Sequence, residues 1–343
     1  MNRYDERYEI RLANKKDIEA IMNFLDKHWK KGHILSSNRE LFEYEFVEGE
    51  NVNFIIALDR NTGSLEAIAG FLKCSMTNDV NKRDLWGSIW KVNDTTANMS
   101  FLGVELIRRL KEFVPHRYHL GIGINPNTTV PIRKVAFHET IKKMNHYYMI
   151  NDSIEKYKIA IINEIHSARP IKHNCNMHVR DFETYEEYAE NFDIGRIDNV
   201  PYKDNWYIKK RFFEHPICKY NVCGVYFGEE CEAVLIYRIV ECEGSRCIRG
   251  IDFLGKYSVI GELGEYFVRL IKENNAEYID FYNSGIDKTF FETAGFEEQI
   301  DDKNIIPNYF GPFVQKNIDI WTRAQDKKTI FFKGDGDQDR PSK

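Results

Sequence analysis

The segment Leu85–Val92, with the sequence LWGSIWKV, is typical of a buried strand because it is rich in aromatic and β-branched residues. A polar stretch, Asn93–Ser100, follows it, and Phe101–Phe113 then carries apolar residues at helical spacing. A strand, a loop and a helix in this order leave backbone N–H groups free at the start of the helix, where an anion can bind. The sequence therefore predicts an anion-binding unit in the first half of the chain.

Strands and helices alternate on both sides of this unit. Lys143–Asn151 and Tyr157–Asn163 are predicted to close the first half as strands, after a helix at Thr129–Thr140. The earlier strands are predicted at Tyr8–Ala13, Asn53–Leu58, Ser64–Cys74 and His119–Asn125.

The second half of the chain repeats this order of elements. Between the halves, Glu164–Asn176 is polar and aperiodic, which is typical of a linker. A length of 343 residues also favours two domains. We therefore predict an α/β fold, in the sense of an α+β sandwich, with tandem duplicated domains at 1–163 and 177–343. Each domain is predicted to hold a mixed, mostly antiparallel sheet flanked by helices.

Composition excludes several classes of protein. The net charge of −5 makes the chain a poor partner for nucleic acid or an anionic membrane. The charged N-terminus is unlike a signal peptide, and no apolar run reaches the roughly 18 residues of a membrane span, so we expect a cytoplasmic protein. The acidic run Asp335–Asp339 lacks the glycine and the closing glutamate of a calcium loop, so we expect no metal.

The strand–loop–helix unit resembles the GNAT superfamily of acyl-CoA-dependent N-acyltransferases. The matching residues are Trp90–Asp94 and Asn98–Gly103, with Asn98 and Phe101 standing where the family motif has Arg and Gly. The resemblance implies that this loop holds the coenzyme A pyrophosphate. It also implies that the C-terminal end of the strand lies beside the pantetheine arm. It implies the following coenzyme-binding residues: Val92, Asn98, Met99, Ser100, Leu102, Gly103 and Asn125.

Three short segments resemble a narrower group, the two-domain N-acyltransferases of nucleotide-linked amino sugars, as in anthrose biosynthesis. These segments are His28–Ser36, Leu85–Asp94 and Phe332–Pro341. The resemblance implies that the acceptor is a nucleoside-diphosphate (dTDP) 4-amino-4,6-dideoxy sugar. We expect it to be bound by four side chains: His33, Tyr148, Lys333 and Arg340.

Acyl transfer to an amine requires a group that accepts the amine proton. Asp94, just past the strand end, is the candidate base; the alternative is a cap for the turn that follows it. Ser88 is a candidate hydrogen-bond partner of the substrate, or an ordinary strand serine. For Asn125, His33 and Tyr148 the alternatives are a loop amide, a surface histidine and a core aromatic residue.

The predicted function is thus an acyl-CoA-dependent N-acyltransferase in which the amine attacks the thioester directly. In this prediction the first domain binds the coenzyme and the second builds the acceptor pocket. Two alternatives remain: a Fem-like aminoacyl or peptidyl transferase that uses aminoacyl-tRNA, and a non-catalytic binding protein on a decayed acyltransferase fold. The acidic net charge argues against a tRNA substrate.

Overall fold

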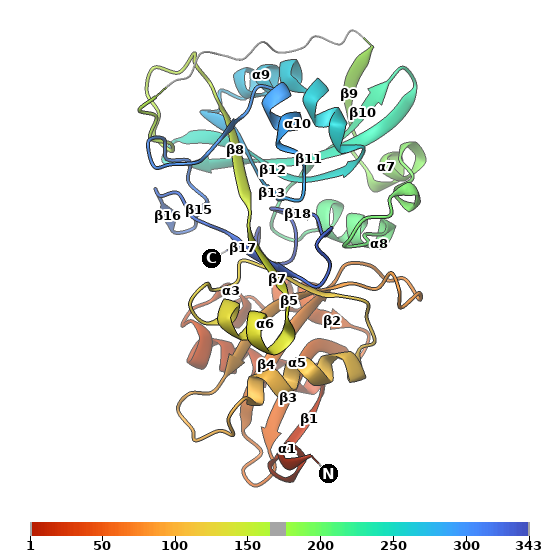
Figure 1. The fold of residues 1–343 in the computed structure, drawn as a ribbon, viewed down its shortest axis with the longest axis vertical. Coiled ribbons are helices and arrows are strands. Elements are labelled where there is room, and N and C mark those ends of the chain that lie inside the picture. The colour runs from red at the N-terminus through yellow and green to blue at the C-terminus, as the bar shows by residue number, and fades with distance from the viewer. Residues whose placement is uncertain (1, 165–175, 342–343) are drawn as a thin grey trace.

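The computed structural model describes residues 2–164 and 176–341. Within these residues the chain forms two lobes stacked along the long axis, each built on one large sheet (Figure 1). Most strand pairs are antiparallel, and helices cover both faces of each sheet. The predicted fold class, with two mostly antiparallel sheets flanked by helices, is confirmed.

The first sheet lies in the N-terminal lobe, where β5 and β6 form a parallel pair. In spatial order its strands are β1 (Tyr8–Asn14), β3 (Asn51–Asp59), β4 (Leu65–Lys73), β5 (Leu85–Val92), β6 (His119–Ile122), β17 (Trp321–Ala324) and β7 (Thr140–Lys143), with β2 (Val47–Glu48) beside β3. One face carries α2 (Ile18–Phe24), α3 (Ile34–Ser37) and α4 (Arg39–Phe46), and the other carries α1 (Arg3–Arg7) and α5 (Leu102–Phe113). Helix α6 (Thr129–Phe137) follows β6.

The second sheet repeats this plan, with β12 and β13 as its parallel pair. Its strands are β14 (Glu297–Glu298), β8 (Asn145–Ile150), β13 (Tyr278–Ser284), β12 (Ser245–Gly255), β11 (Glu230–Cys242), β10 (Asn221–Phe227) and β9 (Met177–Asp181). One face carries α9 (Gly264–Glu273) and α10 (Lys288–Thr293), and the other α7 (Tyr185–Asn191) and α8 (Asn205–Ile208). A small hairpin, β15 (Tyr309–Phe310) with β16 (Phe313–Val314), lies apart from both sheets.

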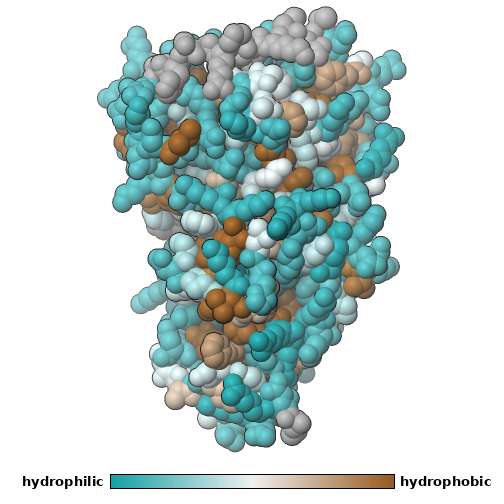
Figure 2. Space-filling model, in the orientation of Figure 1, coloured by the Kyte–Doolittle hydropathy of each residue, from teal (hydrophilic) through white to brown (hydrophobic). Residues whose placement is uncertain are grey.

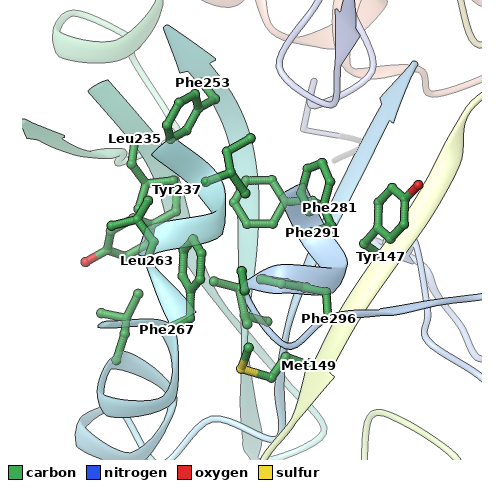
Figure 3. Packing of buried hydrophobic residues seen from close by; sticks show 14 of the residues in the cluster. Tyr147, Met149, Leu235, Tyr237, Phe253, Leu263, Phe267, Phe281, Phe291 and Phe296 are labelled. Atoms are coloured by element: carbon green, nitrogen blue, oxygen red, sulfur yellow. The ribbon is translucent and has the colours of Figure 1, made fainter. Parts of the chain in front are cut away.

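The two lobes exchange one strand each. β8 belongs to the first half of the sequence but lies in the second sheet, between β13 and β14. β17 belongs to the second half but lies in the first sheet, between β6 and β7. Tyr147 and Met149 on β8 point into the core of the second lobe (Figure 3). There the Tyr147 ring stacks on the Phe291 ring, with the two ring centroids 4.4 Å apart. The sheets therefore do not follow the predicted division into 1–163 and 177–343.

One predicted strand is wrong. Tyr157–Asn163 forms an isolated bridge, between Ile161 and Ile305, in place of a strand. The buried carboxylate of Glu277 accepts hydrogen bonds of 2.7–3.0 Å from the backbone N–H groups of residues 158, 159 and 160. These donors are consequently not available to a neighbouring strand. The predicted linker lies largely outside the described residues, at 165–175.

The C-terminal segment enters the second sheet as a short strand, β18 (Phe331–Phe332). β12 and β13 pair at Ile248–Gly250 and diverge beyond, and β18 pairs with β13 at the point of divergence. The Gly334 N–H then donates to the Ile251 carbonyl oxygen at 2.7 Å. The chain thus fills the gap in its own second sheet.

The surface is largely polar, with apolar side chains showing on the lower lobe around α6, where Ile132 and Val135 are exposed (Figure 2). Among the described residues no helix has both the length and the apolar character needed to cross a membrane.

The strand exchange predicts that residues 1–163 do not fold alone. Without β17, the buried edges of β6 and β7 lack a partner, and exposed strand edges promote aggregation. We expect a 1–163 fragment to lack a cooperative melt by circular dichroism, and co-expression with residues 164–343 to restore it. A 1–163 fragment that melts cooperatively by itself would contradict this.

Candidate active site

β5 and β6 diverge soon after they meet. Within the described residues they pair at Leu85 with His119 and at Trp86 with Leu120, and then separate. Arg323 from β17 lies at this point, and a Cβ added to Gly87 or Gly121 would stand 2.5 or 2.4 Å from its guanidinium nitrogens. Both glycines are therefore needed for Arg323 to cross the two strands.

Arg323 belongs to a buried ionic cluster on the α6 side of the gap. Its Nη1 donates to the His119 carbonyl oxygen at 2.7 Å and lies 3.2 Å from Glu139. Arg133 of α6 approaches the same carboxylate at 3.4 Å and lies over the ring of Trp90. Burial and the charge of Arg323 hold the pKa of His119 well below its usual range, so this imidazole is uncharged at neutral pH.

A cavity of about 1120 Å³ passes through the gap and continues between the lobes. On the α6 side it is lined by Trp90, Ile107, Asn125, Thr128, Thr129 and Arg133. On the opposite side it is lined by Trp29, Lys30 and His33, by residues 337–341, and by Arg238, Arg249, Asn308 and Tyr309 of the second lobe. Residues from both halves of the sequence thus meet at one site, and the gap in the first sheet is its centre.

The C-terminal segment forms an ionic network in this cavity. The Ser88 hydroxyl donates to Asp337 Oδ2 at 2.9 Å, and Arg340 Nη2 donates to the same hydroxyl at 3.1 Å. Arg340 also pairs with Asp337 at 3.0 Å and with Glu45 of α4 at 2.9 Å. Asp339, further into the second lobe, pairs with Arg238 at 2.8 Å. This network fixes the tail against β5, beside the gap.

Lys333 is a buried amine on the cavity wall. Its Nζ donates to the Gln338 carbonyl oxygen at 2.8 Å. Burial, together with the nearby positive charge of Arg249, lowers the pKa of Lys333 to about 7. This side chain therefore changes charge in the physiological range.

Five of the predicted site residues line the cavity: His33, Ser88, Asn125, Lys333 and Arg340. His33 Nδ1 accepts from the Leu35 N–H and caps α3, and burial lowers the pKa of His33 to about 4. It therefore meets a ligand as a neutral imidazole. The Asn125 amide oxygen accepts from the N–H groups of residues 127 and 128, so this residue also shapes the turn before α6.

The predicted pyrophosphate loop is held in place by hydrogen bonds to side chains of β4, β1 and α1. The Asn98 amide donates to the Glu66 carboxylate at 3.0 Å, and the Tyr8 hydroxyl bonds both Asn98 and the Met99 N–H. The Tyr4 hydroxyl donates to the Ser100 carbonyl oxygen. The loop thus presents backbone rather than the Asn98 side chain to the start of α5.

Helix α5 begins at Leu102 without a capping side chain. Leu102 is buried in the core, and a Cβ on Gly103 would lie 2.8 Å from Trp90 Nε1 and 3.1 Å from Val92. The Trp90 indole N–H donates to the Gly103 carbonyl oxygen at 2.9 Å. Close packing of the helix on β5 therefore already requires a glycine at position 103.

Asp94 and Tyr148 lie outside the cavity lining. Asp94 is 69% exposed and pairs with Lys91 at 2.8 Å, and this hydrogen bond lowers the pKa of Asp94. Tyr148 is buried in the second lobe, where its hydroxyl donates to Glu297 and accepts from Asn304. Both assignments stay predictions, and neither residue is brought to the gap.

Sequence reasoning missed Asp337, although the segment that contains it was singled out. It also missed Arg238, Arg249 and Arg323, which reach the cavity from distant strands. A polar segment in which Asp alternates with Gly and Gln gives no sign of burial. In the described residues there is no group of three or more His, Cys, Asp or Glu residues that could hold a metal ion.

The lowered pKa of Lys333 predicts a pH-dependent stability. Between about pH 7 and 10.5 the unfolded state binds the Lys333 proton and the folded state does not, so stability rises with pH in this window. We expect urea unfolding at pH 7, 8 and 9 to show that the free energy of unfolding rises more steeply with pH for the wild type than for Lys333→Met. The difference in slope should be at most roughly 1.4 kcal/mol per pH unit. Lys15→Met, at an exposed lysine, is the control; parallel curves for the wild type and Lys333→Met would contradict the assignment.

No protein-family model matches this sequence. No curated protein matches it either. Solved structures do match its fold. A protein from Enterococcus faecalis V583, described as a probable N-acyltransferase, has a TM-score of 0.59 at 10% identity, over 94% of this chain and 73% of that chain. A GCN5-related N-acetyltransferase from Anabaena variabilis has a TM-score of 0.53 at 9% identity, over 92% and 72% of the two chains. At such identities the likeness concerns the fold alone, which this chain shares with the two structures.

Proposed function

We propose that the protein is an acyl-CoA-dependent N-acyltransferase with one active site, at the gap between β5 and β6. The observation that carries the proposal is the difference between the two sheets. The gap in the first sheet lies in the large cavity and is filled by no strand of the described residues, whereas the chain's own β18 fills the gap in the second. The fold shared with N-acetyltransferase structures supports the same reading.

The acyl-CoA binds, in this proposal, on the α5 and α6 side of the gap. Beyond Trp86, β5 has no pairing with β6, so its edge is available to an extended arm such as pantetheine, which adds alongside like a strand. The same edge supplies backbone N–H groups for the thioester oxygen. The start of α5, which has no capping side chain, suits the pyrophosphate.

The acceptor amine approaches from the opposite side, which is lined by the C-terminal segment and the second lobe. Lys333, Arg238 and Arg249 line that part of the cavity. Arg238 pairs with Asp339 and Arg249 with Asp280, whereas Lys333 has no ion pair with a carboxylate of the described residues, so Lys333 is the cation that favours an acceptor with an anionic group. We propose a nucleoside-diphosphate amino sugar, as the sequence resemblance implies, with its diphosphate facing Lys333.

The reaction needs a proton acceptor beside the amine. The amine attacks the thioester carbon, the C–N bond forms, the C–S bond breaks, and the amine gives up a proton while coenzyme A leaves as a thiolate. Asp337 is the carboxylate in the cavity next to the gap, 18% exposed and fixed by Ser88 and Arg340. We therefore assign the base role to Asp337 in preference to Asp94, the residue that the sequence suggested.

Titration calorimetry with acetyl-CoA tests the coenzyme assignment. We expect one binding site per chain, because β18 occupies the second gap. Release of free thiol on addition of a dTDP-linked amino sugar tests the transfer. Absence of heat with any acyl-CoA would overturn the proposal and favour the aminoacyl-tRNA or binding-protein alternatives.

The two candidate bases give opposite predictions. Asp337→Asn keeps the shape of the side chain but cannot accept the proton, and loss of a general base typically lowers kcat by about 10²–10⁴. We expect Asp337→Asn to lose at least about a hundredfold in kcat and to keep its acetyl-CoA affinity, with Asp94→Asn close to the wild type. A pH–rate profile on both variants checks this, with acetyl-CoA binding as the control for folding. The reverse ranking would return the base role to Asp94.

A further inference from the structure

A second, smaller pocket of about 50 Å³ lies between the lobes, on the α4 side of β5. The first lobe contributes α4, β4 and Trp86 of β5, and the second lobe contributes α8 and the π-helical turn Lys209–Phe213. Gly336 of the C-terminal segment completes the wall. No proposed step of acyl transfer uses this pocket.

Three residues that line this pocket carry buried donors without partners. They are the indole Nε1 of Trp86, the hydroxyl of Tyr207 and the Nη2 of Arg211, each unbonded within the described residues. The side chains are 0%, 6% and 9% exposed. An unpaired donor that is removed from water costs free energy, and three around one small pocket indicate that an acceptor occupies it.

The charges around the pocket do not balance. Its two carboxylates are already paired, Glu45 with Arg340 and Glu48 with Lys73. Lys210 and Arg211 also line it, and neither has an ion pair with a carboxylate of the described residues. Lys210 Nζ lies over the rings of Tyr44 and Trp206, at 5.2 and 5.0 Å. The occupant that suits this excess of positive charge is an anion.

Size and donor geometry narrow the choice of anion. A water molecule requires roughly 10–15 Å³ of cavity volume, so a pocket of about 50 Å³ holds about three to five non-hydrogen atoms. The Nη2 of Arg211 can donate to one oxygen of a carboxylate, whose second oxygen accepts from the further N–H and O–H donors. We propose that this pocket binds a free small carboxylate, of the size of formate or acetate, through Arg211, Tyr207 and Trp86.

The test uses the full chain and sodium acetate as the probe, in a buffer without other carboxylates. Acetate should bind the wild type saturably by calorimetry and raise its melting temperature. Tyr207→Phe removes one donor and should weaken acetate binding by about tenfold or more. Without acetate this variant should melt no lower than the wild type, because an unpaired hydroxyl has been removed.

Tyr188→Phe is the matched control. Its hydroxyl is also buried and unpartnered among the described residues, but Tyr188 lies in the core of the second lobe and does not line the pocket. This variant should bind acetate like the wild type. The proposal fails if acetate does not bind, if it binds the wild type and Tyr207→Phe equally, or if chloride binds as tightly as acetate. It also fails if Tyr207→Phe melts well below the wild type without acetate, which would indicate that the hydroxyl holds a structural water.

Discussion

The reciprocal exchange of β8 and β17 is the constraint on which the rest of the structure depends. Each lobe completes its sheet with a strand from the other half of the sequence, and each strand lies between two partners rather than at an edge. The exchange also builds the site. Arg323 reaches the gap between β5 and β6 because β17 lies beside β6. The second half of the chain thus determines the geometry of a gap in the first sheet.

The C-terminal segment connects the two lobes through buried charges. Taking a charge out of water is costly, and each carboxylate of residues 335–340 is compensated by a cation, either of another element or, for Asp337, of the segment itself. Asp335 pairs with Lys203, Asp339 with Arg238, and Arg340 joins Glu45 to Asp337. Because these partners come from both lobes, the segment fixes the position of one lobe relative to the other. It also holds the Ser88 hydroxyl and the Asp337 carboxylate in a fixed arrangement.

Much of the fold follows from local sequence patterns, whereas the site depends on contacts that such patterns do not contain. The strand Leu85–Val92 was predictable from its aromatic and β-branched residues, and the helix from Leu102 from apolar periodicity. The sheet to which Asn145–Ile150 belongs was not predictable, because the alternation of apolar and polar residues specifies a strand but not the strands that pair with it. The role of Asp337 was hidden for a similar reason. A polar tail of Gly, Asp and Gln looks solvated, and only the basic residues of distant strands make its burial favourable. Gly103 has a second explanation that the sequence pattern does not contain, since packing against Trp90 by itself requires a glycine at this position, and its coenzyme-binding role stays a prediction.

The position of β17 has a consequence for biosynthesis. β17 (residues 321–324) lies between β6 and β7, which are both synthesised once residue 143 has been added. The stretch from residue 144 to residue 324 must therefore leave the ribosome before the N-terminal sheet can close. During that interval β6 and β7 present open backbone edges, and a growing chain with such edges is a natural substrate for holding chaperones. The speed at which the stretch between residues 143 and 321 is translated then governs how long the nascent protein stays vulnerable.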